Sequence, residues 1–345
     1  EQQQLFDASQ AYKTANTIRP NEPKFCVNLG LTYLRLLRQD LAISLFQKAA
    51  LLDPTLTNPA DGLITGTSYI AEHSSDIRLA VEQWNSQFKL TTPSTNKKVK
   101  FRRTNANSDR IRIGYISGDF YEHAASYWIE PMLSNSNRSL FEIHCYHNAP
   151  VFDRTTQRIK NYSDRWIDCS LMADEALHEQ IVSDGIQILV DLSNHTQGNR
   201  LTVFNLQAAP IQMTWFGLPI PTGLKSIQYR ITDRWIEPPP EERFGETPLV
   251  LDRFYAAYKP DPRAATVAAC PFETSGFVTF GSFNNLSKIS ISTFEKWANI
   301  LRQVPNSRLL ILASGFESTS FREEVYEHFA NFGIQFRNPS INVCF

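Results

Sequence analysis

The sequence predicts α-helical repeats followed by an α/β region with two parallel-sheet lobes. A period of about 34 residues near the start predicts the repeats. Short apolar strands that alternate with helical segments from about residue 109, and again from about residue 276, predict the two lobes. A chain of 345 residues is long for a single core, which also favours two or three domains.

The composition is that of an ordinary globular protein. Hydrophobic residues make up 42% of the chain and charged residues 20%, and the formal net charge is −1. This balance predicts neither nucleic-acid nor membrane partners. The five cysteines are scattered and lack C-x-x-C spacing, so we expect reduced thiols, a cytoplasmic location and no zinc site.

Residues 1–56 carry the repeat. When 8–20 is shifted onto 42–54, the matching positions include Tyr12 and Phe46, Ala15 and Ala49, and Pro20 and Pro54. Small residues at helix contacts, aromatic residues in the groove and a closing proline are typical of tetratricopeptide repeats, although one amphipathic helical hairpin is the simpler alternative. Because about three repeats are needed for a stable core, one and a half repeats suggest the end of a longer array. Residues 57–100 are expected to form a helical linker region.

Residues 109–258 are expected to form the first Rossmann-like lobe. Apolar strands are predicted at 111–117, 141–147, 165–170, 186–193, 211–217 and 229–233, with crossover helices at 154–163 and 173–185. Residues 276–345 begin a second lobe, with strands at 277–283 and 307–314 and helices at 292–305 and 322–333.

Polar residues follow the strands of both lobes, where open parallel sheets bind ligands. The candidates are Asp119 and His123 after the first strand, His195, Thr196 and Asn199 after the fourth, Gly217 after the fifth, and Asn285 and Lys288 in the second lobe. Each has a simpler reading, such as a helix cap for Asp119, a solvated or structural ring for His123 and a surface cation for Lys288. Their convergence on one rim favours a ligand site. His144 and His147 lie on a strand and are predicted to be structural.

Several common motifs are missing. The chain has no G-x-G-x-x-G fingerprint, P-loop, G-x-S-x-G elbow, H-E-x-x-H or D-x-D, so neither a dinucleotide nor a metal-bound diphosphate is predicted.

The blocks GDFYEH, LVDLSNHTQGNR, AAPIQMTWFGLPIPTGL and FVTFGSFNNLSKIS closely resemble glycosyltransferase family 41. This family contains the O-GlcNAc transferases and the SPINDLY-type O-fucosyltransferases, and the H-T-x-x-N form is closer to the bacterial and SPINDLY branch. The resemblance implies a GT-B fold with tetratricopeptide repeats in front. It also implies transfer of a sugar from a nucleotide diphosphate sugar, UDP-GlcNAc or GDP-fucose, to Ser or Thr of intracellular proteins, without a metal. The repeats would hold the protein acceptor.

The resemblance assigns roles to single residues. His123 matches the active-site histidine and is a candidate general base, since histidine is the side chain that ordinarily gains and loses a proton closest to neutral pH. Lys288 matches the lysine that supports the donor diphosphate, and Asn285 matches a polar donor-binding position. Gly217 and Pro219 would lie beside the sugar, although Leu218 stands where the family commonly has tyrosine.

The family's second lobe continues past the point where this sequence ends. We therefore expect a portion that is truncated at both ends and weakly active or inactive, whose parent transfers N-acetylglucosamine. The alternatives are an O-fucosyltransferase of SPINDLY type and a non-catalytic, repeat-containing scaffold that binds proteins. A phosphorylase-like enzyme of the same fold is a more distant alternative, because no cofactor-lysine motif supports it.

Overall fold

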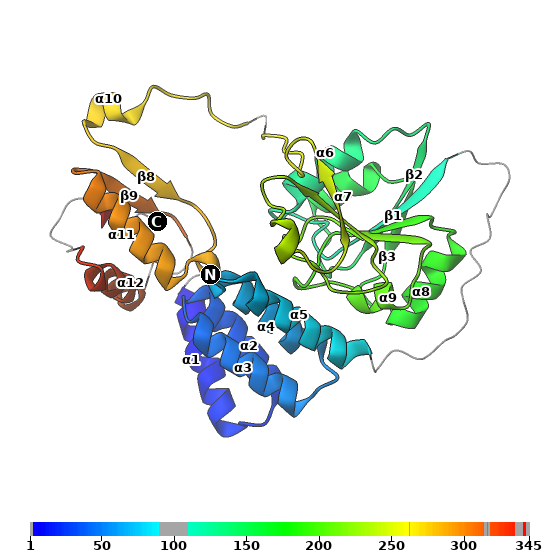
Figure 1. Ribbon diagram of the computed structural model, residues 1–345, viewed down its shortest axis with the longest axis horizontal. Coiled ribbons are helices and arrows are strands. Elements are labelled where there is room, and N and C mark those ends of the chain that lie inside the picture. Colours follow the sequence, from blue (N-terminus) through cyan, green and yellow to red (C-terminus); the bar gives the residue numbers. More distant parts are fainter. Residues whose placement is uncertain are drawn as a thin grey trace. The chain divides into compact units, whose positions relative to one another are not determined.

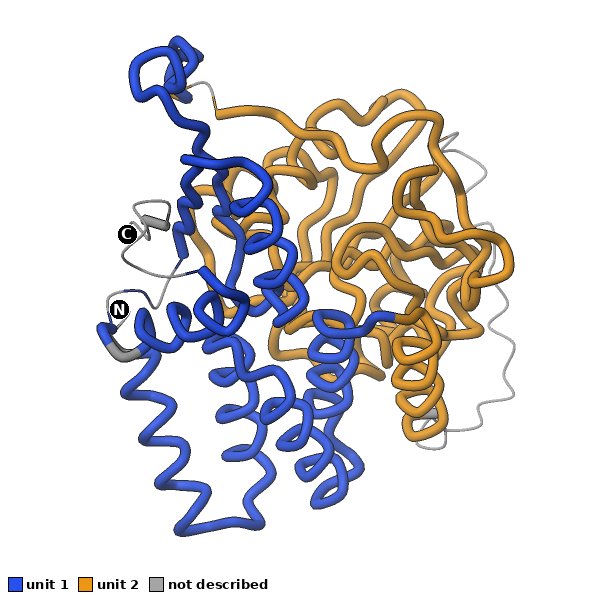
Figure 2. The backbone as a smooth tube through the Cα atoms, turned by 60° about the vertical axis from the view of Figure 1, so that its left-hand side comes forward, with its two compact units in different colours: residues 1–72, 264–345 blue, residues 73–263 orange. Residues whose placement is uncertain are grey.

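The computed structural model describes residues 3–89, 110–261, 263–313, 316, 318–334 and 341–342. Within it the chain forms two compact units, one of residues 1–72 with 264–345 and one of residues 73–263 (Figure 2). The first is called unit 1 below and the second unit 2. The last part of the expected linker region, residues 90–100, lies outside the described residues, and the domain boundaries given above stay predictions.

Unit 2 is built on a seven-stranded, fully parallel sheet with the strand order β3-β2-β1-β4-β5-β6-β7. Figure 1 labels its strands β1, β2 and β3. The strands are β1 (Ile111–Ser117), β2 (Phe141–His147), β3 (Arg165–Asp168), β4 (Ile188–Asp191), β5 (Ile211–Thr214), β6 (Tyr229–Asp233) and β7 (Thr247–Leu251). The helices are α5 (Ser74–Lys89), α6 (Ser126–Ser134), α7 (Arg154–Asn161), α8 (Asp174–Ser183), α9 (Leu201–Asn205) and the 3₁₀ turn η1 (Pro240–Glu242).

The first six strands agree with the predicted ones, because their apolar residues enter a buried core. That core includes Ile143, Cys145 and Val190, all at most 3% exposed. Strand β7 was missed. It lies at the edge of the sheet, and Leu249, Val250 and Leu251 are exposed there, so its side chains do not show the burial pattern on which the prediction of a strand depends.

Four helices of unit 1 stack as the repeat predicts. They are α1 (Gln3–Ile18), α2 (Pro23–Arg35), α3 (Gln39–Leu52) and α4 (Thr57–Ile70). The ring of Phe46 on α3 fills the groove between two glycines, because a Cβ on Gly30 of α2 would lie 2.7 Å from it and one on Gly62 of α4 would lie 2.8 Å from it. Helix α4 therefore continues the stack, although its sequence had lost the visible repeat pattern.

The rest of unit 1 is a small α/β lobe. A parallel sheet of order β10-β9-β8 contains β8 (Thr279–Ser282), β9 (Arg308–Ile311) and β10 (Ile341–Asn342). It is accompanied by α10 (Pro271–Ser275), the 3₁₀ turn η2 (Leu286–Lys288), α11 (Ile291–Gln303) and α12 (Thr319–Asn331). Leu36 and Leu37, from the turn between α2 and α3, belong to the same buried cluster as Phe294, Leu309 and Val325. The repeat helices and this lobe thus share one core.

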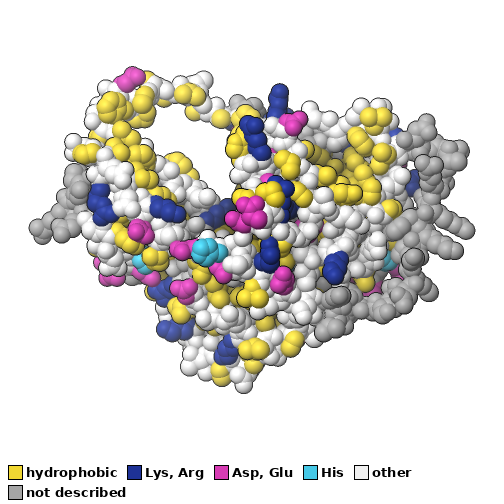
Figure 3. All heavy atoms as spheres, in the orientation of Figure 1, with side chains coloured by type: hydrophobic (Ala, Val, Ile, Leu, Met, Phe, Trp, Pro, Cys, Tyr) yellow, Lys and Arg dark blue, Asp and Glu magenta, His cyan; other side chains and the backbone are white. Residues whose placement is uncertain are grey.

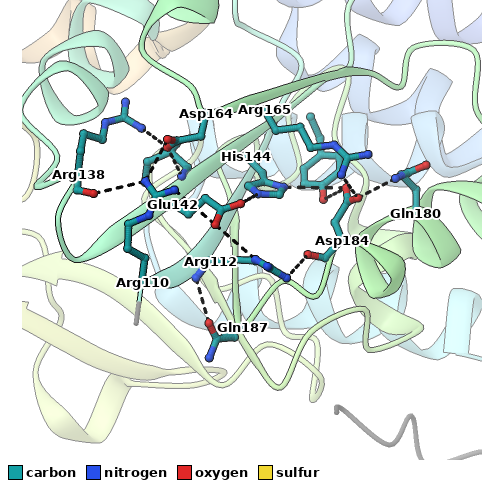
Figure 4. Close-up of polar contacts among 12 residues, drawn as sticks. Arg110, Arg112, Arg138, Glu142, His144, Asp164, Arg165, Gln180, Asp184 and Gln187 are labelled. Atoms are coloured by element: carbon teal, nitrogen blue, oxygen red, sulfur yellow. Dashed lines mark hydrogen bonds and ion pairs between the residues drawn. The ribbon is translucent and has the colours of Figure 1, made fainter. Parts of the chain in front are cut away.

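A polar network lies where strands β1 to β4 begin, at the opposite edge of the sheet from the loops at their carboxyl ends (Figure 4). The buried His144 contacts Glu142 at 2.9 Å. The buried carboxylate of Asp184 accepts a hydrogen bond from Tyr146 at 2.8 Å and pairs with Arg165 at 2.8 Å. The charged side chains of this network thus have partners within the fold, which supports the structural role predicted for His144.

The described charged side chains of both signs are mixed on the one face that Figure 3 shows. In the described ranges we find no helix with the length and hydropathy of a membrane span.

Candidate functional site

The loops at the carboxyl ends of β1, β4 and β5 in unit 2 come together, because these strands are neighbours in the sheet. The backbone N–H of Gly118, after β1, donates to the hydroxyl of Ser193, after β4, at 3.2 Å. The side chain of Asn194 donates to the carbonyl of Ile220, after β5, at 2.8 Å. One edge of the sheet therefore gathers seven of the predicted site residues: Asp119, His123, His195, Thr196, Asn199, Gly217 and Pro219.

His123 is the exposed titratable group at the start of this edge. Its Nδ1 accepts a hydrogen bond from the backbone N–H of Ala125 at 3.2 Å and lies 3.6 Å from a carboxylate oxygen of Asp119. Because Nδ1 accepts, the neutral ring carries its proton on Nε2. Burial raises the pKa of Asp119, and the nearby His123 opposes that rise.

His195 is buried, whereas a residue that contacts a ligand needs an accessible side chain. It is 1% exposed, its Nε2 lies 3.1 Å from the carbonyl oxygen of Thr222, and its ring packs edge-on against Trp84 of α5 with centroids 4.9 Å apart. Its ring therefore joins the β5 loop to helix α5. Thr196 and Asn199 are partly exposed, and Asn199 donates to the Thr196 carbonyl at 3.0 Å.

The turn at Gly217 makes a close backbone approach. Gly217 has φ +68°, and a Cβ there would lie 2.5 Å from the carbonyl oxygen of Ser193. The preceding Phe216 also has a positive φ, of 72°. Such a backbone is strained for a residue other than glycine and is held only by its surroundings. Pro219, two residues further on, is exposed.

The buried carboxylate of Asp191 ties the β4 and β5 loops to the sheet. It accepts hydrogen bonds from the backbone N–H groups of Ser193 at 3.1 Å and Asn194 at 2.9 Å, and from the Thr214 hydroxyl at 2.8 Å. Burial raises the pKa of Asp191, and the hydrogen bond from Thr214 counteracts this. Asp191 is the last residue of β4, and the sequence had already marked it as one of the polar residues at the end of the fourth apolar strand.

Asn285 and Lys288 lie in unit 1. Asn285 directly precedes η2, and Lys288 is the last residue of η2. The side-chain oxygen of Asn285 accepts hydrogen bonds from the backbone N–H of Ser287 at 3.1 Å and from its hydroxyl at 2.6 Å, so Asn285 caps the turn. Lys288 is exposed, whereas its neighbours Ser287 and Ile289 are buried. The turn therefore presents the ammonium group of Lys288 to solvent.

A cavity of about 870 Å³ lies in unit 1, within the size range of small-molecule sites. The segments directly after β8 and β9 line one part of it, with Asn284, Asn285 and Leu312 among them. The repeat helices α1 and α2 line the rest, with Tyr12, Asn28, Leu31, Thr32 and Arg35 among them. The contribution of the repeats was not predicted, because it depends on contacts between segments some 250 residues apart in the sequence.

Two further observations concern metals and thiols. Across the described ranges, no group of three or more His, Cys, Asp and Glu side chains is arranged to hold a metal ion. Cys26, Cys145 and Cys169 are free and buried, and Cys270 is free and exposed.

Comparison with known proteins identifies the chain's relatives. The family model for glycosyl transferase family 41 matches residues 68–246. The probable UDP-N-acetylglucosamine–peptide N-acetylglucosaminyltransferase SPINDLY of Oryza sativa subsp. japonica is 33% identical over 303 residues, which cover 85% of this chain and 32% of that protein. The probable UDP-N-acetylglucosamine–peptide N-acetylglucosaminyltransferase SEC of Arabidopsis thaliana is 33% identical over 213 residues, which cover 59% of this chain and 22% of that protein. The chain thus spans about a third, or less, of the length of these curated relatives.

The fold is also that of a solved relative. A mutant of the O-GlcNAc transferase of Thermobaculum terrenum superimposes with a TM-score of 0.88 at 29% identity, and the match covers 99% of this chain and 65% of the other. This likeness confirms the predicted order of helical repeats followed by a GT-B-type α/β region. Because the family model matches more than half of the residues, the chain belongs to glycosyl transferase family 41.

Proposed function

We propose that this chain is part of a protein O-glycosyltransferase. The enzyme transfers a sugar, N-acetylglucosamine in the first instance, from a nucleotide diphosphate sugar to Ser or Thr hydroxyl groups of proteins. The observation that carries the proposal is the cavity at the ends of β8 and β9, since open α/β sheets bind nucleotides there. Its lining residue Asn285 caps the turn that carries Lys288.

Lys288 would stabilise the leaving group. In the reaction the acceptor oxygen bonds to the anomeric carbon, the bond from that carbon to the diphosphate oxygen breaks, and the hydroxyl proton passes to solvent water. Negative charge then develops on the departing diphosphate. A fixed ammonium group close to that oxygen lowers the barrier, because it interacts more strongly with the transition state than with the bound donor. Asn285 would keep the turn in shape and offer its amide N–H groups to the donor.

His123 would act as a hydrogen-bond donor. With Nδ1 accepting from Ala125, the neutral ring offers only an N–H at Nε2, and a general base needs a free lone pair at the atom that faces the hydroxyl. This geometry favours a role in orienting a substrate oxygen over the role of general base that the family resemblance implied. Thr196, Asn199, Gly217 and Pro219 would shape the same edge of unit 2, and the buried His195 would hold its loops in place.

The implied partners are a nucleotide sugar and protein acceptors bound by the repeat helices. No metal or cofactor is needed in this scheme, because Lys288 supplies the cation that a metal-dependent transferase takes from its metal. A cytoplasmic location fits the free, buried thiols of Cys26, Cys145 and Cys169.

Calorimetric titration with UDP, UDP-GlcNAc and GDP-fucose tests the proposal. We expect weak but saturable binding of UDP and UDP-GlcNAc by the unsubstituted chain, and a further loss of affinity in Lys288→Ala. Lys296→Ala, on the neighbouring helix α11, is the control for removal of a lysine from the same lobe. A folded chain that binds none of the three ligands would contradict the proposal and favour the non-catalytic scaffold.

GDP-fucose is the second candidate donor, because the H-T-x-x-N block resembles the SPINDLY branch. Tighter binding of GDP and GDP-fucose than of UDP and UDP-GlcNAc would replace the N-acetylglucosamine donor with the fucose donor. Incubation with donor and a Ser/Thr-rich peptide, followed by mass spectrometry, would show transfer as the mass of the added sugar.

A further inference from the structure

A buried glutamine of the repeat helices is bonded to the turn that carries Lys288. Gln39 begins helix α3 and is 6% exposed. Its side-chain N–H group donates to the carbonyl oxygen of Ile289 at 2.8 Å and to that of Ser287 at 3.3 Å. These two carbonyls belong to the residues on either side of Lys288. One amide group of the repeats therefore holds both flanks of the exposed lysine.

The turn is short, and from its own residues it is held by the Asn285 cap and two backbone hydrogen bonds. Within η2 the backbone N–H of Lys288 donates to Asn285 at 3.1 Å and that of Ile289 to Leu286 at 2.9 Å, so it is a single 3₁₀ turn. Such short turns have poorer hydrogen-bond geometry than an α-helix. The buried amide of Gln39 supplies a further constraint from outside the turn, where water would otherwise be needed to satisfy two buried carbonyls.

The two residues before Gln39 anchor the start of helix α3 to the α/β lobe. The preceding Arg38 pairs with Glu324 of α12 through two hydrogen bonds, of 2.9 Å and 3.3 Å. Leu37 adopts a left-handed φ of 59°, a conformation that glycine usually supplies, while its side chain is buried in the core of the lobe. A strained backbone with a buried side chain shows that this turn of the repeats is held firmly where it meets the lobe.

We propose that Gln39 is a positioning residue for Lys288, so that the repeat helices set the location of the ammonium group that serves the donor diphosphate. The inference rests on the proposed function of Lys288. It adds that the repeats take part in donor binding as well as in holding the acceptor. Helix α2 precedes Gln39 and lines the same cavity as Asn285. The repeat helices therefore line this cavity and also hold the turn that carries Lys288.

Two substitutions of matched size test the link. Gln39→Met keeps the length of the side chain and removes its N–H donor, and Gln47→Met makes the same change at an exposed position of the same helix. Hydrogen exchange of residues 286–290 should be faster in Gln39→Met than in both the unsubstituted chain and Gln47→Met. Calorimetry should show UDP affinity lowered roughly two- to tenfold in Gln39→Met, the range expected for loss of one hydrogen bond, and unchanged in Gln47→Met.

The double variant Gln39→Met/Lys288→Ala separates positioning from general destabilisation. If Gln39 acts through Lys288, its substitution should change UDP affinity little once the ammonium group is gone. An equal loss in both backgrounds would overturn the proposal, as would unchanged exchange at 286–290 in Gln39→Met.

The same experiment keeps this inference apart from the proposed function. If the unsubstituted chain binds no UDP, or if Lys288→Ala binds it normally, the role given to Lys288 is wrong, and so is a positioning role that depends on it. If Lys288→Ala weakens UDP binding while Gln39→Met does not, the proposed function stands and only the role of Gln39 is refuted.

Discussion

The turn between α2 and α3 gives a quantitative prediction, because two adjacent leucines there differ in one respect. Leu36 and Leu37 are 3% and 8% exposed and belong to the same core cluster. Leu36 has φ −103°, whereas Leu37 has φ +59°. The N–H of Arg38 donates to the carbonyl of Tyr33 at 2.9 Å, which closes the helix in a Schellman-type arrangement with Leu37 at the usual glycine position.

Truncation to alanine at either position should lower the free energy of unfolding of unit 1 by about 2–5 kcal/mol, the range for a buried leucine replaced by alanine. Further truncation to glycine separates them. At position 36 glycine should be worse than alanine, by about 0.5–1 kcal/mol, because of its greater freedom in the unfolded chain. At position 37 glycine also relieves the left-handed strain, about 1–2 kcal/mol. The alanine-to-glycine step should therefore be more favourable at 37 than at 36 by about 1–2 kcal/mol.

Hydrogen exchange as a function of urea, followed by mass spectrometry on peptides from α11, measures the stability of this unit separately from unit 2. Phe294 and Ala298 of α11 lie in the same core as both leucines, so the peptides report on it directly. The loss of the methyl group and the change in chain entropy are common to both positions and cancel in the comparison. An alanine-to-glycine difference that is the same at 36 and 37 would refute the strain argument.

Three further predictions concern unit 2. Gly217→Ala should destabilise the β5 loop well beyond the roughly 1 kcal/mol expected for a left-handed alanine alone, because its Cβ would meet the Ser193 carbonyl at 2.5 Å. Gly276→Ala is the control, because Gly276 has φ +70° and a Cβ there would meet nothing within 4 Å. Separate hydrogen-exchange experiments on this variant measure the cost of the left-handed backbone without a clash. Burial raises the pKa of Asp119, so the stability linked to its protonation is present below the unfolded pKa and is lost as pH rises through the folded one. Asp119→Asn should therefore gain in urea midpoint relative to the unsubstituted chain as the pH rises above about 4, the ordinary pKa of an aspartate, and a constant difference would contradict this. Asp184→Asn should lower the stability of unit 2 by about 1–3 kcal/mol, measured by tryptophan fluorescence, because Tyr146 and Arg165 lose a charged acceptor; an unchanged urea midpoint would show that the network contributes nothing.

The parts of the fold that could be predicted depend on local patterns. Strands β1 and β2 were placed from their apolar residues, and the stack of α1 to α3 was placed from the spacing of residues such as Ala42 and Phe46. Strand β7 was missed because an exposed edge strand leaves no alternation to detect. The continuation of the stack into α4 was missed because Gly62 keeps the packing contact while the surrounding motif changes.

The candidate site shows the same division. Its residue types could be found from the polar residues at the carboxyl end of each strand, because parallel strands end at a common edge. The functional state of each side chain could not be found that way. The burial of His195, the acceptor role of Nδ1 in His123 and the capping role of Asn285 depend on partners that only the folded chain supplies.

The shared core of unit 1 limits what can be concluded from an experiment that deletes the repeats. Leu36 and Leu37 complete the core of the lobe, Gln39 holds the turn around Lys288, and Arg35 and Asn285 line one cavity. Deleting the repeats would therefore remove buried contacts of the small α/β lobe along with the proposed acceptor surface. A loss of donor binding after such a deletion does not isolate acceptor recognition. Substitution of exposed residues on the repeats is the appropriate separation, because it leaves Leu36, Leu37 and Gln39 in place.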